Sequence, residues 1–539
     1  MPVILGFSPN PLSACFLFPI IIWLTYWDIL RGKWVSDDIA GIWLTPDNRG
    51  PYTGKLQKPL SWHNIFKKLR FELGKMPNPD KDWQRKKLPP FLSNPVAHHR
   101  LNLWIFCGVS VLLYLFLLRV LGNPVAFLAT LLFTVHPLGC QTVGWISGIG
   151  YVISTFFMLL GFNVAFLVTD LGWLHTPLGV VGALGLYGFI QWMAVEAHFA
   201  TIGAALILAW LQMWPFAIVA GILACMQGFQ TLKSALDLRF RTFKEQAMGH
   251  STQFRWRKLL VCLKTLYYDT RMAVFPKRIG LYHTFHYHYE LPYAEAEDQT
   301  LWAGVAIFVA GIVGFFIGPP AIQLGLLWFL AFMMIFLNLV TANQFVVDRY
   351  VWLPSFGVCV LAAALLPLWA VLILFGIALM RTWAHIPTYF DELFFYQSNI
   401  WNFPDSEVAY GNLGVAQFQR GLVASSFDSW LVSTSINPEF DVPWYNLSSH
   451  IRARGVPPLS YYPVLYQMLP PNTWESISKE PTIAHLQLGR MLLEKALSCR
   501  QCHFREMWQK ELTNLNREIH AFRSPPPPPQ LVRPLMELT

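Results

Sequence analysis

Long apolar segments recur along the first 380 residues and are separated by polar stretches. A helix needs about 20 mostly apolar residues to cross a bilayer, and most of these segments are close to that length. The clearest cover residues 11–27, 101–121, 145–168, 178–195, 301–318, 321–340 and 356–380. Residues 199–229 are too long for one span and contain Pro215, so we expect two shorter helices broken there. The pattern predicts an all-α, multi-pass membrane protein with about nine to eleven transmembrane helices.

The polar stretches suggest how the chain is divided. Residues 28–100 form a long first polar loop, and residues 232–300 are polar, basic and aromatic, as expected of an interfacial segment. Hydropathy falls after Arg381, which indicates a change from membrane to soluble structure. We therefore expect a membrane domain over 1–380, a helical domain over 381–522 and a proline-rich tail over 523–539.

An internal repeat lies in the predicted soluble domain. Four residues recur at a constant offset of 34: Tyr410, Leu413, Arg420 and Gly421 return as Trp444, Leu447, Arg454 and Gly455. Pro438 lies where the first unit would close, and a looser third unit begins near Leu486. This period is typical of tetratricopeptide repeats, which are pairs of antiparallel helices. Stacked repeats form concave surfaces, so we expect partner proteins to bind this domain.

Composition supports the membrane assignment and excludes one class of function. The chain is 54% hydrophobic and 13% charged, whereas soluble domains average roughly 25% charged residues. Its 23 Trp and 41 Phe residues suit the aromatic belts of membrane interfaces. The formal charge of +9 lies mostly in loops. Basic loops beside a bilayer contact anionic head groups, so we do not expect nucleic-acid binding.

Two adjacent carboxylates, Asp37 and Asp38, follow the first apolar segment. Carboxylates at a membrane face can act as a general base or bind a divalent metal ion. The alternative is a solvated helix cap, because Ser-Asp-Asp is also a common helix start.

Five stretches carry a resemblance to a known family, namely residues 35–38, 132–148, 195–196, 275–283 and 348–355. With the repeats that follow, their order and spacing make the chain similar to the tetratricopeptide-repeat O-mannosyltransferase-like proteins. These belong to the GT-C class of membrane glycosyltransferases. The resemblance covers nearly the whole chain and implies a GT-C-like helical bundle.

This resemblance implies transfer of a sugar from a polyprenyl-phosphate donor to a protein hydroxyl. Asp37 or Asp38 would accept the hydroxyl proton. The residues that would surround the donor or bind its phosphate are His136, Glu196, Lys277, Arg278, Asp348 and Arg349. The resemblance also places the repeats on the periplasmic or lumenal side of a bacterial inner membrane or an ER-type membrane.

The chain departs from the family pattern in three motifs. Gln141 stands where members usually have Glu, Gly148 to Tyr151 replace Gly-Arg-x-Asp, and Val195-Glu196 replaces Lys-Glu. Two of these changes remove a cation, an Arg and a Lys, so a phosphate bound at this site would meet less positive charge. The alternative function is therefore a non-catalytic membrane scaffold that binds partner subunits through its repeats.

Two further patterns suggest cofactors. Cys499, Cys502 and His503 form the Cys-x-x-Cys-His pattern by which a c-type haem is attached. The alternative is a chance pair of cysteines in a repeat helix, or a local disulfide between them. Alternate histidines at 283, 286 and 288 would share one face of a strand and could bind a metal ion. An aromatic interfacial loop is the favoured interpretation of that segment.

Overall fold

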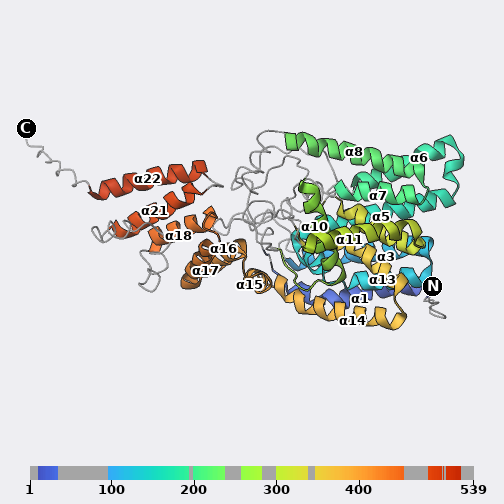
Figure 1. Ribbon diagram of the computed structural model, residues 1–539, viewed down its shortest axis with the longest axis horizontal. Helices are drawn as coiled ribbons and strands as arrows, with labels where there is room; N and C mark the ends of the chain where they lie inside the picture. Colours follow the sequence, from blue (N-terminus) through green and yellow to red (C-terminus); the bar gives the residue numbers. More distant parts are fainter. Residues whose placement is uncertain are drawn as a thin grey trace, which may run out of the picture. The chain divides into compact units, whose positions relative to one another are not determined.

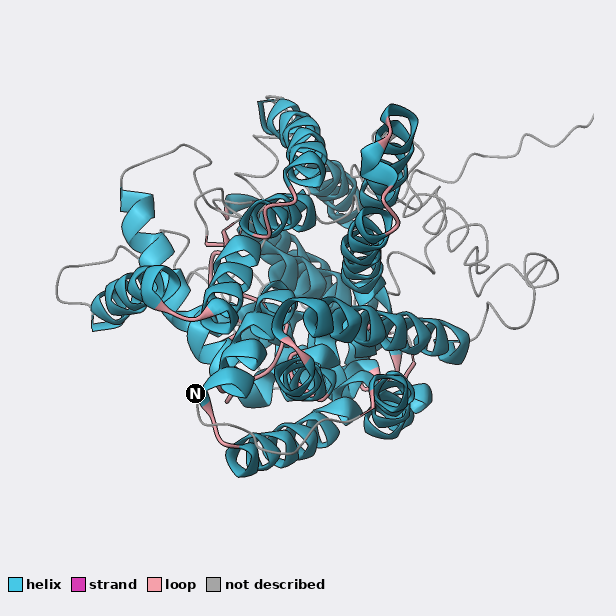
Figure 2. Ribbon diagram, turned by 90° about the vertical axis from the view of Figure 1, so that its right-hand side faces the viewer, coloured by secondary structure: helices cyan, strands magenta, loops and turns pink. Residues whose placement is uncertain are grey.

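The computed structural model describes residues 10–33, 35, 95–193, 198–236, 257–281, 299–334, 336–337, 346–454, 483–499, 502 and 505–523. Every regular element in these ranges is a helix, and they contain no strand (Figure 2). The chain forms two compact units, Met1–Pro404 and Asp405–Thr539. Each unit is described by itself.

The first unit is a bundle whose helices lie side by side (Figure 1). In chain order the helices are α1 (Pro11–Tyr26), α3 (Pro95–Leu121), α4 (Asn123–Thr134), α5 (Ile149–Asp170), α6 (Pro177–Met193), α7 (His198–Trp210), α8 (Trp214–Leu236), α10 (Arg257–Val274), α11 (Gln299–Ile317), α12 (Pro320–Met333), α13 (Asp348–Leu365), α14 (Leu368–His385) and α15 (Glu392–Asn402). Short 3-10 turns follow α1 (Trp27–Arg31) and α14 (Ile386–Tyr389), and a π turn covers Cys140–Gly144.

Six of the described helical segments are long and apolar enough to cross a membrane: Pro11–Arg31, Pro95–Leu121, Ile149–Asp170, Gln299–Ile317, Asp348–Leu365 and Leu368–Tyr389. Five shorter apolar helices accompany them, over Asn123–Thr134, Pro177–Trp192, Thr201–Trp210, Trp214–Met226 and Pro320–Met333. The all-α architecture expected from the apolar pattern is thus present, and its longest helices suit a bilayer.

Prolines divide two of the apolar segments. The expected break at Pro215 is confirmed, because α7 ends at Trp210 and α8 begins at Trp214. The expected single span over 356–380 is wrong: α13 ends at Leu365, and α14 begins after Pro367. Proline has no backbone N–H, and it disfavours helical geometry in the residue before it, so the helix ends there.

Aromatic side chains fill the centre of the bundle. The Phe133 and Trp352 rings lie 5.3 Å apart, and those of Trp328 and Phe356 lie 4.9 Å apart. The Trp328 indole N–H donates to the Leu353 carbonyl at 2.9 Å, so this buried polar atom is paired. Helices α12 and α13 approach so closely that a Cβ on Gly357 would clash with backbone atoms of α12. Small residues allow this kind of contact between membrane helices.

Large apolar side chains are exposed on the outer helices of the bundle. They include Leu12, Phe16 and Leu24 on α1, Phe316 and Ile317 on α11, and Trp369, Ile373 and Met380 on α14. Contiguous apolar surface of this extent is unfavourable in water but favourable against lipid tails. This surface is what an integral membrane protein presents to the bilayer.

The second unit consists of paired helices. These are α16 (Glu407–Gln419), α17 (Val423–Ile436), α18 (Asp441–Arg454), α21 (Ala484–Ser498) and α22 (Arg505–Arg523). Helices α16 and α18 begin at Glu407 and Asp441, the same 34-residue interval as the sequence repeat. Gly421, with φ +76°, makes the turn between α16 and α17.

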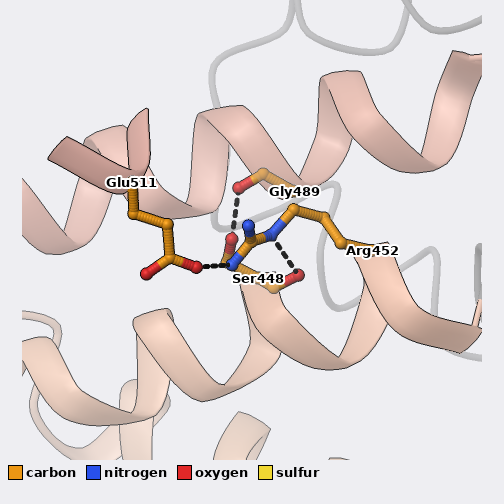
Figure 3. Close-up of polar contacts among 4 residues, drawn as sticks. All are labelled: Ser448, Arg452, Gly489 and Glu511. Atoms are coloured by element: carbon orange, nitrogen blue, oxygen red, sulfur yellow. Dashed lines mark hydrogen bonds and ion pairs between the residues drawn. The ribbon is translucent and has the colours of Figure 1, made fainter. Parts of the chain in front are cut away.

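Buried aromatic and polar contacts join the hairpins of this unit. The Trp444 indole donates to the Pro438 carbonyl at 2.9 Å, and the Ser448 hydroxyl donates to the Gly489 carbonyl. Arg452 pairs with Glu511 at 2.5 Å and so links α18 to α22 (Figure 3). Trp508 stacks on Tyr445 with ring centroids 4.8 Å apart. Helix α22 is therefore part of the packed unit.

Trp508 and Met507 provide a matched test of that packing. Trp508 is 1% exposed, whereas its neighbour Met507 is 52% exposed. We expect Trp508→Ala to lower the free energy of unfolding of the second unit by about 3–5 kcal/mol, as for other buried aromatic truncations. Met507→Ala should change it by less than about 0.5 kcal/mol. Pulse proteolysis of the full chain in urea measures both, and equal effects would show that α22 is not docked through Trp508.

Candidate functional site

Several helix ends meet at one end of the first unit. The Asn102 side chain, near the start of α3, donates to the Val143 and Trp145 carbonyls at 3.2 and 3.4 Å. The Thr382 hydroxyl of α14 donates to the Val135 carbonyl at 2.8 Å, just after α4. These contacts hold segment 135–148, which contains only short π and 3-10 turns, against the ends of α3 and α14. The segment belongs to one of the stretches that carry the family resemblance.

The first polar loop leaves the bundle at this end. The Trp145 indole N–H donates to the Val35 carbonyl at 3.2 Å, and the Arg349 guanidinium lies 5.6 Å from the Trp145 ring centroid. Asp37 and Asp38 lie outside the described residues. They follow Val35 by two and three positions, so the loop that carries them starts beside Trp145 and Arg349.

Asp348 and Arg349, at the start of α13, contact two other segments. The Asp348 carboxylate is fully buried and accepts from the Gly280 N–H at 2.8 Å. The Arg349 N–H donates to the Gln141 side-chain oxygen at 2.8 Å. Asp348 therefore holds the backbone at Gly280. The sequence had predicted a different role for it, at the phosphate-binding site.

Lys277 and Arg278 are both exposed, and they belong to the segment that Asp348 contacts. The Arg381 guanidinium donates to the Pro276 and Lys277 carbonyls at 2.7 and 2.8 Å. It also lies 5.5 Å from the Phe275 ring centroid. Two exposed cationic residues thus lie on a short segment whose backbone is held by a third cation, Arg381.

His136 is buried and neutral. Its Nε2 lies 3.0 Å from the Ala273 carbonyl, which can only accept, so this nitrogen carries the proton. Burial lowers the pKa of His136 from 6.5 to about 4. His136 therefore contributes a hydrogen bond at neutral pH, without a positive charge.

An apolar groove opens beside these residues. Its volume is about 350 Å³, and its walls come from the end of α4, from α13, from α14 and from residues 273–276. Most of the lining is aliphatic, with Leu132, Val358 and Ile377 among it. The polar members are His136 and Arg381. The groove thus combines an apolar body with a cation and a hydrogen-bonding side chain.

The structure adds Arg381, Gln141 and Asn399 to the predicted site. Arg381 had a sequence signal, because it is the charged residue that ends the last apolar segment. Gln141 was noted only as a departure from the family pattern. Asn399 accepts from the Leu281 N–H at 2.7 Å, and nothing in its local sequence indicates this contact.

Other predicted site residues are not described. Glu196, the histidines at 283, 286 and 288, and His503 lie outside the described ranges. Within those ranges, no three His, Cys, Asp or Glu side chains gather in a way that could bind a metal ion. Asp37 and Asp38 stay the predicted ligands of a divalent metal ion, and both lie outside the described residues.

Cys499, one cysteine of the predicted haem-attachment pattern, is buried. Cys499 is 1% exposed and packs in the hydrophobic core of the second unit. Its sulfur lies 3.3 Å from the Lys495 carbonyl and 3.7 Å from that of Pro438. Burial raises the pKa of this thiol to about 12. A haem vinyl group would reach this sulfur only if the surrounding core opened, and haem attachment at Cys499 and Cys502 stays a prediction from the sequence.

Searches against protein-family models, curated proteins and solved structures find no match to this chain.

The pKa of His136 gives a test of its burial. Between pH 6.5 and about 4 the unfolded chain binds a proton at this residue that the folded chain does not. The free energy of unfolding should therefore fall as the pH drops through this window. His136→Gln keeps an N–H donor but cannot titrate, so its melting temperature in detergent should fall less between pH 7 and pH 4.5. The same decrease in both proteins would contradict a buried neutral His136.

Proposed function

We propose that the chain is a membrane glycosyltransferase with a GT-C-like fold, which transfers a sugar from a polyprenyl-phosphate donor to a protein hydroxyl. The observation that supports this most is that stretches far apart in the sequence meet in space. Four of the five stretches that carry the family resemblance take part, through residues 35, 132–148, 275–281 and 348–355. Buried hydrogen bonds join them at one end of the bundle. A shared site is a direct reason for stretches so distant in sequence to meet.

The groove suits a lipid-linked donor. Its aliphatic walls complement one isoprenoid chain. Arg381 lines the groove, and Lys277 and Arg278 directly follow Pro276, a lining residue. Guanidinium groups bind phosphate oxygens through paired hydrogen bonds, and an ammonium group adds a point charge. A singly phosphorylated lipid matches both properties.

Asp37 or Asp38 would be the general base. The carboxylate would accept the proton of the acceptor hydroxyl while the hydroxyl oxygen bonds to the anomeric carbon. The bond between that carbon and the donor phosphate oxygen breaks, and polyprenyl phosphate leaves with the electron pair. Arg349, close to the start of this loop, would stabilise the developing negative charge.

Substitution of the carboxylates tests the catalytic role. We expect Asp37→Asn or Asp38→Asn to lower sugar transfer by at least about 100-fold, because general-base catalysis contributes that much or more. The control is Asp28→Asn, since Asp28 is exposed and pairs with the exposed Arg31 on the same part of the chain. Transfer is measured with radiolabelled lipid-linked sugar and purified protein in vesicles. Full activity in both loop variants would exclude this mechanism.

Substitution of the exposed cations tests donor binding separately from catalysis. We expect the double variant Lys277→Gln/Arg278→Gln to bind polyprenyl-phosphate vesicles at least about 5-fold more weakly at low salt, and the difference to shrink as salt screens the charges. Arg271→Gln is the matched control, because Arg271 is an exposed cation at the end of α10. Equal binding by all three proteins would remove these cations from the site.

A non-catalytic membrane scaffold is the second candidate. The observation that favours it is that the neutral Gln141 side chain holds backbone, since its oxygen accepts from the Arg349 N–H at 2.8 Å. In this function the second unit would act as tetratricopeptide repeats that bind partner subunits. Both candidates place it on the periplasmic or lumenal side of a bacterial inner membrane or an ER-type membrane.

A further inference from the structure

Residues 275–281, called here the basic strap, connect the end of α10 to the start of α13 through side-chain contacts. Arg381 donates to the Pro276 and Lys277 carbonyls, and the Gly280 N–H donates to Asp348. The next N–H, that of Leu281, donates to the Asn399 side-chain oxygen at 2.7 Å. Lys277 and Arg278 lie between these attachment points, so the attachments determine where the two cations are.

Asn399 is itself rigidly held. It is 1% exposed, and its side-chain nitrogen donates to the Phe395 carbonyl one turn earlier in α15 at 2.7 Å. The amide orientation is thus fixed by the helix, and the oxygen is directed at the Leu281 N–H. A Cβ on Gly280 would lie 2.7 Å from this oxygen and 3.0 Å from the Phe403 ring. The strap therefore packs directly on α15 and has no room to shift toward it.

The segment that carries Asn399 also holds the start of the first polar loop. The Lys33 N–H donates to the Phe390 carbonyl at 3.1 Å, and the Lys33 ammonium lies 3.6 Å from the Asp391 carboxylate. Asp391 is the N-cap of α15, and its side chain accepts from the Leu393 N–H. One short helix and its cap thus contact both the basic strap and the chain that leads to Asp37 and Asp38.

We propose that Asn399 is a positioning residue for the phosphate-binding cations: through the Leu281 N–H it fixes the basic strap and so places Lys277 and Arg278. The role rests on the proposed function, because it assumes that these cations bind a lipid phosphate. It makes donor binding depend on α15, the last helix before the second unit begins at Asp405.

Three variants of the full chain in lipid nanodiscs test this role. Asn399→Leu keeps the size but removes the acceptor. Asn399→Gln keeps both an amide oxygen for the Leu281 N–H and an amide nitrogen for the Phe395 carbonyl, and it serves as the conservative variant. Asn402→Leu is the control, because Asn402 lies on the same helix and donates to the Ser398 carbonyl. Hydrogen exchange of a peptide ending just after Leu281 reports the attachment, and exchange in α3 and α5 reports folding.

We expect Asn399→Leu to speed exchange of the Leu281 amide at least 10-fold, with α3 and α5 unchanged, and to weaken binding of polyprenyl-phosphate vesicles at least 3-fold. Asn402→Leu should stay within 2-fold of the wild type in both measurements, and Asn399→Gln should lose less than Asn399→Leu in both. Unchanged Leu281 exchange in Asn399→Leu would overturn the attachment. Faster exchange with undiminished vesicle binding would overturn the placement of the cations.

The wild-type protein separates this proposal from the one on which it rests. If the wild type does not bind polyprenyl-phosphate vesicles at all, the proposed function fails and the cation-placing role fails with it. The exchange measurement would still report whether Asn399 holds Leu281. If the wild type binds and Asn399→Leu does not, with exchange altered as expected, both are supported.

Discussion

Irregular backbone inside a membrane protein must find its hydrogen-bond partners within the protein, because lipid offers none. At one end of the first unit this requirement is met by side chains from distant helices. Asn102, Asp348, Thr382 and Asn399 each bond a backbone group outside the α-helices, and Gln141 bonds a backbone N–H in the first turn of α13. Without them these segments would leave polar groups unpaired at considerable cost. The arrangement of the candidate site depends on this set of bonds.

The same constraint divides the polar residues of the site into two groups. Buried residues such as Asp348 and Gln141 use their oxygens to hold backbone, whereas Lys277 and Arg278 remain exposed. A neutral Gln141 is understandable at this position. It is 1% exposed and accepts from the residue next to Asp348, so a Glu there would place a second buried carboxylate near the first. The departure from the family pattern therefore has a structural explanation that does not depend on catalysis.

The apolar pattern predicted the helices well, because each buried or lipid-facing helix needs a continuous apolar segment. It missed the break at Pro367, since the segment on either side is equally apolar. It also placed a domain boundary at Arg381, where hydropathy falls, although the compact unit continues to Pro404. Hydropathy reports where the chain leaves an apolar environment and does not report where packing ends.

The site was only partly predictable for a different reason. The stretches were selected from their order and spacing in the sequence, but the contacts that join them connect residues far apart in the chain. Asn399 and Leu281 are 118 positions apart, and Arg381 and Pro276 are 105 apart. No local pattern marks an Asn in a polar helix as the partner of such a distant amide. The carboxylates Asp37 and Asp38 remain a sequence prediction.

The extension of the first unit to Pro404 bears on how such a chain could evolve. Repeat domains are readily gained, lost or exchanged between proteins when the join lies in a linker with few contacts. A recombination at residue 381 would remove Asp391 and Asn399, and with them the partners of Lys33 and of the Leu281 amide. A join at residue 405 would leave those contacts intact. The first unit can therefore be joined to a different C-terminal domain without losing these contacts only if its own last helix, α15, is kept.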